Sequence, residues 1–153
     1  MRRKKKSQRP SWDEYFLQIA KLVSTRATCP RLQVGAVLVK DRKIISTGYN
    51  GSPRKTDQCD EVGCYLVNGH CARVLHAEEN AVIAAAYHGV STKGTILYVR
   101  YFPCDHCAKI IINAGVEKVI YRENYKNSDQ VFTRQMFKQA GVELVEMSHG
   151  RKK

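Results

Sequence analysis

Two segments decide the fold expected for this chain of 153 residues: His76-Ala77-Glu78-Glu79-Asn80 and Pro103-Cys104-Asp105-His106-Cys107. One imidazole and two thiolates can hold a zinc ion whose fourth tetrahedral position is left for water. His76, Cys104 and Cys107 provide this ligand set. Pro103 closes a loop, and the dipole at a helix N-terminus favours thiolate, so we expect both segments to begin helices that face one zinc ion.

Glu78 lies two residues after His76, just inside the expected helix, and is the candidate catalytic residue. Zinc lowers the pKa of bound water from about 15.7 towards roughly 7, and a neighbouring carboxylate can take up and return its proton. The pattern H-x-E followed by P-C-x-x-C is the signature of zinc-dependent nucleobase deaminases. A redox pair at Cys104 and Cys107, or a structural role for His76, explains only half of this pattern. The two halves together favour a deaminase site.

The length of the chain fits one domain, which we place at residues 11–148, between basic tails at residues 1–10 and 149–153. No apolar stretch approaches the roughly 20 residues of a membrane span, and no apolar region follows the basic N-terminus as in a signal peptide. We therefore expect a cytoplasmic protein without a membrane partner.

The formal charge of +12 is concentrated at the ends of the chain. The two tails carry nine of the 26 basic residues, which leaves 17 basic and 14 acidic side chains in residues 10–150. Solvated tails that aid solubility explain this pattern better than a dedicated nucleic-acid arm, which stays open as an alternative. The modest positive charge of the core suits a phosphorylated substrate.

Hydrophobic periodicity predicts alternating helices and strands along the domain. Ser11 and Glu14 form a capping box at the first helix, whose aromatic residues we expect in the core, and Gly35 permits close approach by a helix or a ligand. The alternation implies an α/β fold, a three-layer α/β/α sandwich with a central five-stranded mixed sheet. In chain order we expect a helix at residues 11–27, strands at 34–39 and 44–49, a helix at 76–88, a strand at 95–99, a helix from 104, a strand at 116–121, a helix at 129–140 and a strand at 142–147.

Residues 50–75 form a long connection with little periodicity, and such loops are usually functional or tied down. Cysteines in a cytosolic chain are more often metal ligands than disulfides. A second, structural zinc ion would order this loop. The spacing of the cysteines is irregular, so buried free thiols remain the competing interpretation. The candidate ligands are Cys29, Cys59, Cys64 and Cys71, with His70 as a substitute for one cysteine.

Over residues 11–147 the chain resembles the deoxycytidylate (dCMP) deaminase family of the cytidine deaminase-like fold, including bacterial late-competence relatives. The segment from Gly48 to Arg54 separates this family from deaminases of tRNA adenosine and of free nucleosides better than the zinc pattern does. The motifs that carry the resemblance are Arg26-Ala-Thr-Cys29, Val34-Gly-Ala-Val37, Gly48-Tyr-Asn-Gly-Ser-Pro-Arg54, Cys59-Asp-Glu-Val-Gly-Cys64, Gly69-His-Cys71, His76-Ala-Glu78 with Asn80, and Pro103-Cys-Asp-His-Cys-Ala-Lys109.

The resemblance implies hydrolytic deamination of dCMP to dUMP, a step towards thymidylate, in a homo-oligomer that is a hexamer or a dimer. Zinc would be held by His76, Cys104 and Cys107. Hydroxide would add to C4 of cytosine, and Glu78 would carry protons to N3 and to the departing ammonia. The resemblance also places substrate contacts at Arg26, Asn50, Ala77 and Tyr125, and contacts to dCTP or dTTP effectors at Gly48, Tyr49 and Gly51.

Two positions depart from the family pattern. A small hydroxyl residue is common near Arg100, and an arginine is common near Tyr87. The first departure would alter phosphate or base contacts, and the second would weaken regulation by nucleotides. Neither affects the zinc chemistry.

Two other functions stay open. The chain could deaminate a polynucleotide, either tRNA adenosine or single-stranded cytosine, or it could be a catalytically silent accessory protein that binds nucleic acid. Glu78 argues against the silent protein, because a binding module has no use for a proton shuttle. Fold alone does not decide between these functions.

Overall fold

The computed structural model describes residues 9–125 and 130–147. Residues 1–8 and 148–153 lie outside the described residues, so the basic tails at 1–10 and 149–153 remain sequence-based predictions. The elements, in chain order, are α1 (Trp12–Ser24), β1 (Gly35–Lys40), β2 (Lys43–Tyr49), α2 (Cys59–Val62), β3 (Leu66–Val67), β4 (His70–Cys71), α3 (Ala77–Tyr87), β5 (Ile96–Tyr101), α4 (Asp105–Asn113), β6 (Lys118–Glu123), α5 (Gln130–Gln139) and β7 (Glu143–Glu146).

The central sheet has the strand order β2-β1-β5-β6-β7. β1 pairs antiparallel with both β2 and β5, whereas β5, β6 and β7 run parallel to one another. Parallel neighbours need crossover connections, and α4 and α5 supply them. The predicted five-stranded mixed sheet is confirmed, and its strand boundaries lie within two residues of the predicted ones.

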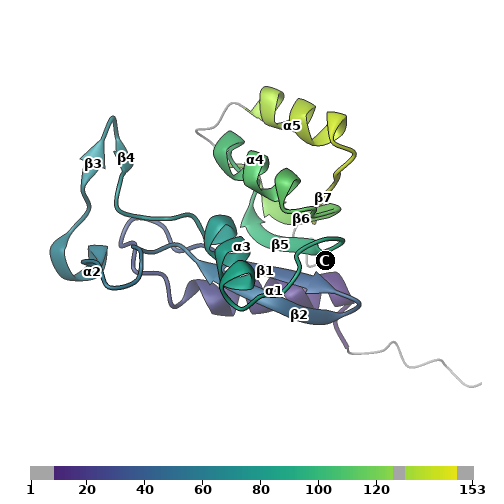
Figure 1. Ribbon diagram of the computed structural model, residues 1–153, viewed down its shortest axis with the longest axis horizontal. Helices are drawn as coiled ribbons and strands as arrows, with labels where there is room; N and C mark the ends of the chain where they lie inside the picture. The colour runs from purple at the N-terminus through teal and green to yellow at the C-terminus, as the bar shows by residue number, and fades with distance from the viewer. Residues whose placement is uncertain (1–8, 126–129, 148–153) are drawn as a thin grey trace, which may run out of the picture.

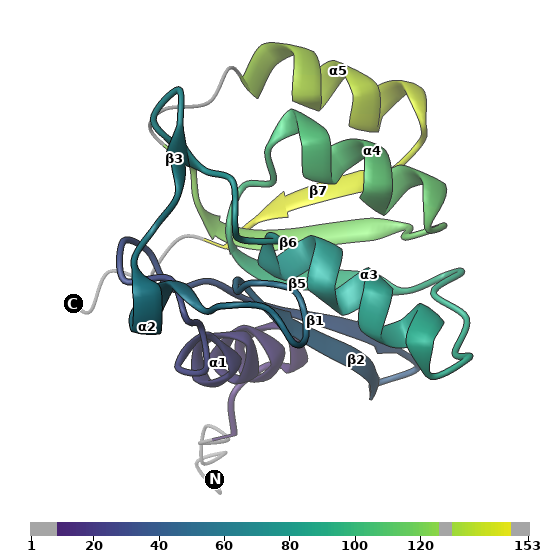
Figure 2. The same ribbon diagram turned by 60° about the vertical axis from the view of Figure 1, so that its left-hand side comes forward.

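Helices cover both faces of this sheet. α1 lies against one face, and α3, α4 and α5 lie on the other (Figure 1, Figure 2). Side chains of β1 alternate between the two faces: Val37 and Val39 pack with α1, whereas Ala36 and Leu38 pack with α3 and α4. This arrangement confirms the predicted three-layer α/β/α sandwich.

The aromatic side chains of α1 differ from their prediction. Phe16 is buried, but Trp12 is 49% exposed and Tyr15 is 43% exposed, so the expectation that all three lie in the core was wrong for two of them. Trp12 stacks on Phe16 with ring centroids 5.8 Å apart, and the Arg42 guanidinium lies 5.2 Å from its ring. The indole is therefore covered by neighbours at the edge of the core while much of its surface stays in water.

Two glycines let helices approach the sheet closely. A Cβ atom at Gly35 would overlap the backbone of Ala20 in α1, and a Cβ atom at Gly48 would overlap the backbone of Ala77 and Ala81 in α3. Helix packing therefore explains Gly35. It also gives a structural reason for Gly48, which the sequence had suggested as an effector contact.

Residues 52–74 leave the body of the molecule as a projection that carries α2, β3 and β4 (Figure 1). Gly51 and Leu75 close its base through two backbone hydrogen bonds of 3.2 and 2.9 Å. The sequence analysis missed these three elements, because segments of two to four residues are too short to show a periodicity. His76 follows directly, so the projection stands beside the first ligand segment.

Within residues 9–125 and 130–147, no helix is both long enough and apolar enough to cross a membrane.

Candidate metal centre and active site

Both predicted ligand segments begin helices. His76 is the N-cap residue of α3 and Cys104 is the N-cap residue of α4, and both have extended backbone conformations. The Cys104 thiol lies 3.5 Å from the backbone N–H of Cys107, one turn into its helix. Because α3 and α4 pack side by side on one face of the sheet, their N-termini converge.

The side chains of His76, Cys104 and Cys107 come together at this point. Nδ1 of His76 lies 3.5 Å from Sγ of Cys104 and 3.3 Å from Sγ of Cys107. The three ligand atoms all lie within 4.8 Å of one another. Zinc–nitrogen and zinc–sulfur bonds of about 2.0 and 2.3 Å at a tetrahedral angle separate N and S by about 3.6 Å. The donor set and its spacing therefore fit a zinc ion.

The pKa values of the three ligand side chains shift in different directions, and they indicate which ligands carry protons before a metal binds. Hydrogen bonds from Cys107 and His76 lower the pKa of the Cys104 thiol to about 4. The hydrogen bond with Cys104 raises the pKa of His76 to about 9, and the neighbouring Cys104 raises that of Cys107. Without metal, the imidazole and the buried Cys107 thiol retain protons that a zinc ion must displace, so zinc binding here releases protons.

Glu78 lies in the first turn of α3 and faces the same region. Its side chain lines the cavity described below, although only 6% of the residue is exposed. Burial raises the pKa of its carboxyl to about 7. A group with this pKa exchanges protons readily at neutral pH, as a general acid and base requires.

Glu79 connects the two ligand segments. Its Oε2 accepts a hydrogen bond of 2.7 Å from the backbone N–H of His76, and its Oε1 lies 2.8 Å from Nε2 of His106. His106 stands between the two cysteines of α4, and its side chain is 62% exposed. The carboxylate therefore ties the start of α3 to the first turn of α4.

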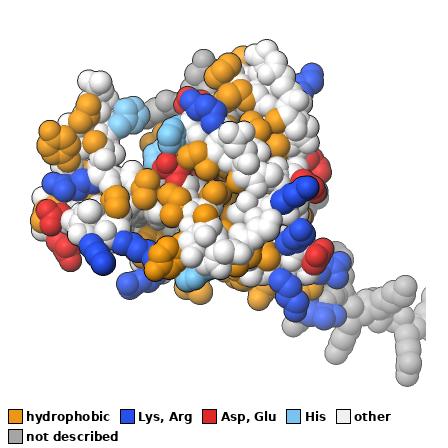
Figure 3. Space-filling view, viewed as in Figure 1, with side chains coloured by type: hydrophobic (Ala, Val, Ile, Leu, Met, Phe, Trp, Pro, Cys, Tyr) orange, Lys and Arg blue, Asp and Glu red, His pale blue; other side chains and the backbone are white. Residues whose placement is uncertain are grey.

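A cavity of about 460 Å³ opens beside this cluster. The space-filling view shows histidine and acidic side chains gathered between the projection and the body of the molecule (Figure 3). The predicted residues among its lining are Asn50, His70, His76, Ala77, Glu78, Cys104 and Tyr125.

Asn50 lines the cavity and also forms side-chain hydrogen bonds to the backbone before β1. It is 8% exposed, its Oδ1 accepts a hydrogen bond of 2.8 Å from the N–H of Val34, and its Nδ2 donates one of 2.7 Å to the carbonyl of Leu32. The amide thus holds the segment before β1 in place, and the sugar contact suggested for it remains a prediction.

Three other predicted positions lie elsewhere in the described part of the chain. Arg26 is exposed just after α1 and is not among the residues that line the cavity. Tyr49 is 38% exposed, and its carbonyl accepts a hydrogen bond of 2.7 Å from Asn80. Gly51 belongs to the base of the projection.

The two departures from the family pattern lie outside the cavity lining too. Arg100 pairs with Glu123 at 3.2 Å, and its guanidinium lies 4.9 Å from the ring centroid of Tyr101, which lines the cavity; Arg100 itself is not among the described lining residues. Tyr87 is 68% exposed, and the Arg54 guanidinium lies 4.1 Å from its ring centroid.

Sequence reasoning missed several lining residues. Tyr101 and Phe102 lie where β5 ends and precede Pro103, and Tyr101 contacts Tyr125 with ring centroids 5.9 Å apart. Their place immediately before the Pro-Cys pair was a usable signal, since ligands bind at the carboxyl ends of strands in open α/β sheets. The other missed residues are Leu32, Val34, Asp105 and Phe132.

The suggested second metal ligands separate into two groups. The thiols of Cys59, Cys64 and Cys71 lie within 4.8 Å of one another in the projection. Cys29 is buried and interacts electrostatically with Cys64, but it is not part of that close group among the described residues. His70 lines the cavity instead. The structure therefore brings together three of the five candidates.

Comparison with known proteins identifies relatives that match most of the chain. A family model for the zinc-binding region of cytidine and deoxycytidylate deaminases matches residues 10–123. ComE operon protein 2 from Bacillus subtilis (strain 168) is 44% identical over 135 residues, which cover 88% of this chain and 70% of that protein. A deoxycytidylate deaminase from Saccharomyces cerevisiae is 36% identical over 146 residues, which cover 92% of this chain and 46% of the yeast protein. The chain thus spans less than half of the yeast protein.

A solved structure shows the same architecture. The dCMP deaminase from the cyanophage S-TIM5, in complex with dCMP and dUMP, has a TM-score of 0.79 and is 36% identical. The likeness covers 92% of this chain and 100% of the phage chain. The family-model match over residues 10–123 contains both ligand segments and Glu78.

Proposed function

Since the chain belongs to the cytidine and deoxycytidylate deaminase family, we propose that it catalyses the zinc-dependent hydrolysis of dCMP to dUMP and ammonia. The observation that carries this proposal is the convergence of His76, Cys104 and Cys107 beside the buried Glu78 at one wall of the cavity. The 36% identity with a phage enzyme solved with dCMP and dUMP supports the choice of substrate. Several relatives of the chain are also named deoxycytidylate deaminases.

His76, Cys104 and Cys107 would hold the zinc ion, which as a Lewis acid supplies an activated water at neutral pH. Glu78 takes one proton from the attacking water and delivers it to N3 of cytosine as the oxygen adds to C4. It then carries the remaining hydroxyl proton to the amino nitrogen, so the C4–N bond breaks and ammonia leaves. A carboxyl whose pKa is about 7 can accept and return a proton in both steps.

The cavity fits a nucleotide in size and in chemistry. Its volume of about 460 Å³ lies within the range of about 300–1,000 Å³ of small-molecule sites. Aromatic walls from Tyr101, Phe102 and Tyr125 suit a flat base. We assign the base contact to the backbone of Ala77, the sugar contact to Asn50 and the phosphate contact to Tyr125.

Arg26 is the remaining phosphate candidate. It is exposed and lies outside the described cavity lining, so we assign it a contact only with a phosphate group that extends out of the cavity. A homo-oligomer and dCTP or dTTP effectors near Gly48, Tyr49 and Gly51 also belong to this proposal. A free mononucleotide substrate suits a cytoplasmic enzyme.

Ammonia release from the zinc-loaded protein tests the function directly. We expect turnover of dCMP and little turnover of deoxycytidine or single-stranded DNA. Glu78→Gln keeps the shape of the side chain but removes proton transfer, so it should lower kcat by about 100-fold or more. Glu143→Gln, at an exposed ion pair with Lys118, is the matched control and should behave as wild type.

Two results would count against this function. Zinc-loaded protein that leaves dCMP unchanged excludes dCMP as the substrate. Turnover of single-stranded DNA or tRNA in place of dCMP identifies a deaminase of polynucleotides.

A further inference from the structure

The projection of residues 52–74 has little secondary structure to hold it folded. α2 has four residues, and β3 and β4 have two residues each. A short two-stranded hairpin is marginally stable at best in water. The projection also exposes apolar side chains, which stabilise it little: Val62, Tyr65, Leu66 and Val67 are each about half exposed or more.

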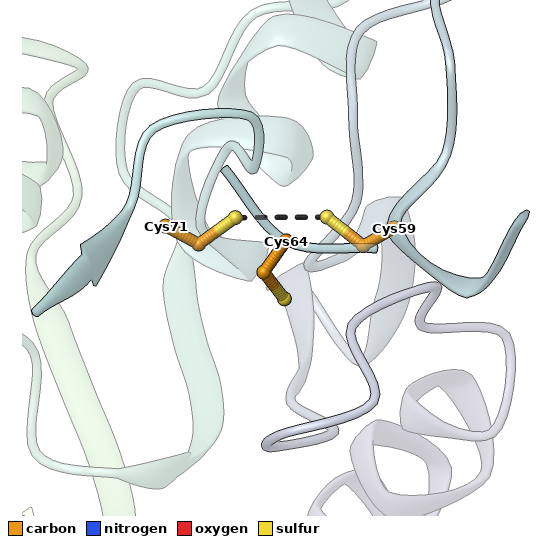
Figure 4. Close-up of side chains that lie close together, drawn as sticks. All are labelled: Cys59, Cys64 and Cys71. Carbon is orange, nitrogen blue, oxygen red and sulfur yellow. Dashed lines mark hydrogen bonds between the residues drawn. The ribbon is translucent and has the colours of Figure 1, made fainter. Parts of the chain in front are cut away.

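Three thiols converge inside this projection. Cys59 begins α2, Cys64 follows its end, and Cys71 lies in β4, so three separate segments each contribute one sulfur (Figure 4). Sγ of Cys59 lies 3.6 Å from Sγ of Cys71, and all three sulfur atoms lie within 4.8 Å of one another. All three are free cysteines.

This spacing fits thiolates that share a metal ion. Zinc–sulfur bonds of about 2.3 Å at a tetrahedral angle separate two sulfur atoms by about 3.8 Å. A disulfide would need a distance of about 2.05 Å, so the sulfurs stand at the separation of metal ligands. Soft thiolates select zinc over the oxygen-seeking ions magnesium and calcium.

We propose that Cys59, Cys64 and Cys71 bind a structural zinc ion that holds the projection in its folded form. Each thiol gives up its proton on binding, and the three protons pass to the solvent. The fourth position is open to Cys29, whose thiol interacts with Cys64. Structural zinc sites commonly contain three or four cysteines, and their binding energy contributes directly to folding.

The three-cysteine site lies next to a wall of the cavity. His70 precedes Cys71 in β4 and lines the cavity beside His76. After β4 the chain leaves the projection through Leu75, whose backbone pairs with Gly51, and continues into α3. The second zinc ion therefore shapes one wall of the cavity without touching the reacting atoms.

Zinc stoichiometry tests the proposal without reference to activity. The full chain is purified under reducing conditions, supplied with zinc and freed of loose metal by gel filtration. We expect about two zinc ions per chain by elemental analysis, since each site has its own ligand set. Cys64→Ser should reduce this value to about one. Cys104→Ser should also leave about one, and the combined variant should leave almost none.

Cobalt distinguishes the two sites. Cobalt bound to thiolates gives an intense sulfur-to-metal charge-transfer absorption. Cys104→Ser loaded with cobalt should retain the absorption of a site with three thiolates, and Cys64→Ser should retain the weaker absorption of a site with two. Cys64 is used because it is less buried than Cys59, and circular dichroism checks that the variant folds.

Hydrogen exchange reports on the structural role. In Cys64→Ser, amide exchange should accelerate in residues 52–74 but not in β5 or β6. Wild-type protein that binds one zinc ion overturns the proposal, as does a Cys64→Ser variant that keeps two. A protein that binds two zinc ions but does not deaminate dCMP contradicts the proposed function alone.

Discussion

Glu79 is the residue whose role is least evident from the zinc pattern. It follows Glu78, the proposed catalytic residue, and it is not among the described residues that line the cavity. It is only 9% exposed, and its two oxygens bind the N–H of His76 and Nε2 of His106. The position of His106 between the two cysteines of the zinc pattern is compatible with an outward-facing side chain or with one that supports the ligands. In the structure His106 contacts Glu79, as a residue that supports the ligands should. This contact depends on how α3 and α4 pack together, which a local sequence pattern does not specify.

Breaking this link should weaken zinc binding. Removing a group that orients metal ligands typically costs 10–100-fold in metal affinity. We expect His106→Ala to lower the affinity of the catalytic site for zinc by about 10-fold, because Glu79 then loses its contact with α4. Competition with a chelator of known affinity measures this, in protein that carries Cys64→Ser so that one site is observed.

Lys109→Ala provides the control, since Lys109 pairs with Asp105 at the exposed surface of the same helix, 3.4 Å away. Equal affinities in the two variants would mean that the contact between His106 and Glu79 does not position the ligands.

Gly48 illustrates a residue whose role the sequence assigned differently. Alanine at this position would place a Cβ atom against the backbone of α3, and overpacking of this kind costs about 1–3 kcal/mol. We expect Gly48→Ala to lower the free energy of unfolding by that amount in urea denaturation. Ile83→Ala, at a position 48% exposed on α3, should change it by less than about 0.5 kcal/mol. A stable Gly48→Ala variant with altered response to dCTP would instead support the effector role.

At the scale of elements, α1 depends on polar contacts as well as apolar packing. Tyr98 of β5 is buried, and its hydroxyl donates a hydrogen bond of 2.8 Å to Asp13 at the start of α1. Arg122 of β6 pairs with Glu14 in the same turn of the helix. These contacts fix the N-terminal end of α1 against the parallel strands.

Tyr98→Phe removes one of these contacts while keeping the ring. We expect a loss of about 1 kcal/mol in the free energy of unfolding, typical of one hydrogen bond. Burial and Asp13 raise the pKa of Tyr98 above its ordinary value of 10.0. The unfolded tyrosine loses its proton near pH 10 while the folded one keeps it. The stability from this group is therefore complete below pH 10 and declines as the pH rises further.

Urea denaturation at about pH 8 and about pH 11 measures this dependence. Wild type should lose more stability between the two values than Tyr98→Phe does. Tyr87→Phe is the control, because Tyr87 is exposed on α3. Parallel losses in wild type and Tyr98→Phe would show that Tyr98 does not contribute to the alkaline decline.

The elements also show how far sequence patterns reach. Apolar runs such as Val37 to Val39 and the capping residue Ser11 are local signals, so the strands of the central sheet and the start of α1 could be predicted. α2, β3 and β4 could not, because segments of two to four residues are too short to show a periodicity. Burial of Phe16 but not of Trp12 likewise depends on where α1 crosses the sheet, which periodicity does not specify.

At the scale of the whole molecule, the distribution of positive charge distinguishes a mononucleotide substrate from a polynucleotide substrate. The described domain carries a small net charge, and most of the formal charge of +12 comes from nine basic residues in the tails. The cavity lies on the body of the molecule, between the projection and the starts of α3 and α4. A mononucleotide held inside it depends on lining residues, whereas a polynucleotide would extend beyond the cavity and gain affinity from basic side chains outside it.

Removing the tails should therefore leave the turnover of a mononucleotide almost unchanged. We expect deletion of residues 1–9 and 151–153 to change kcat and KM for dCMP by less than about twofold, at both low and physiological salt. A variant with serine at the nine basic tail positions separates the effect of charge from that of length. Binding to a polynucleotide weakens steeply with salt in proportion to the phosphates neutralised, so loss of the tails would reduce both its affinity and its salt dependence. If dCMP turnover fell in both variants, the tails would contribute to the nucleotide site itself. If only single-stranded DNA binding fell, the tails would serve a second ligand while the cavity alone served dCMP.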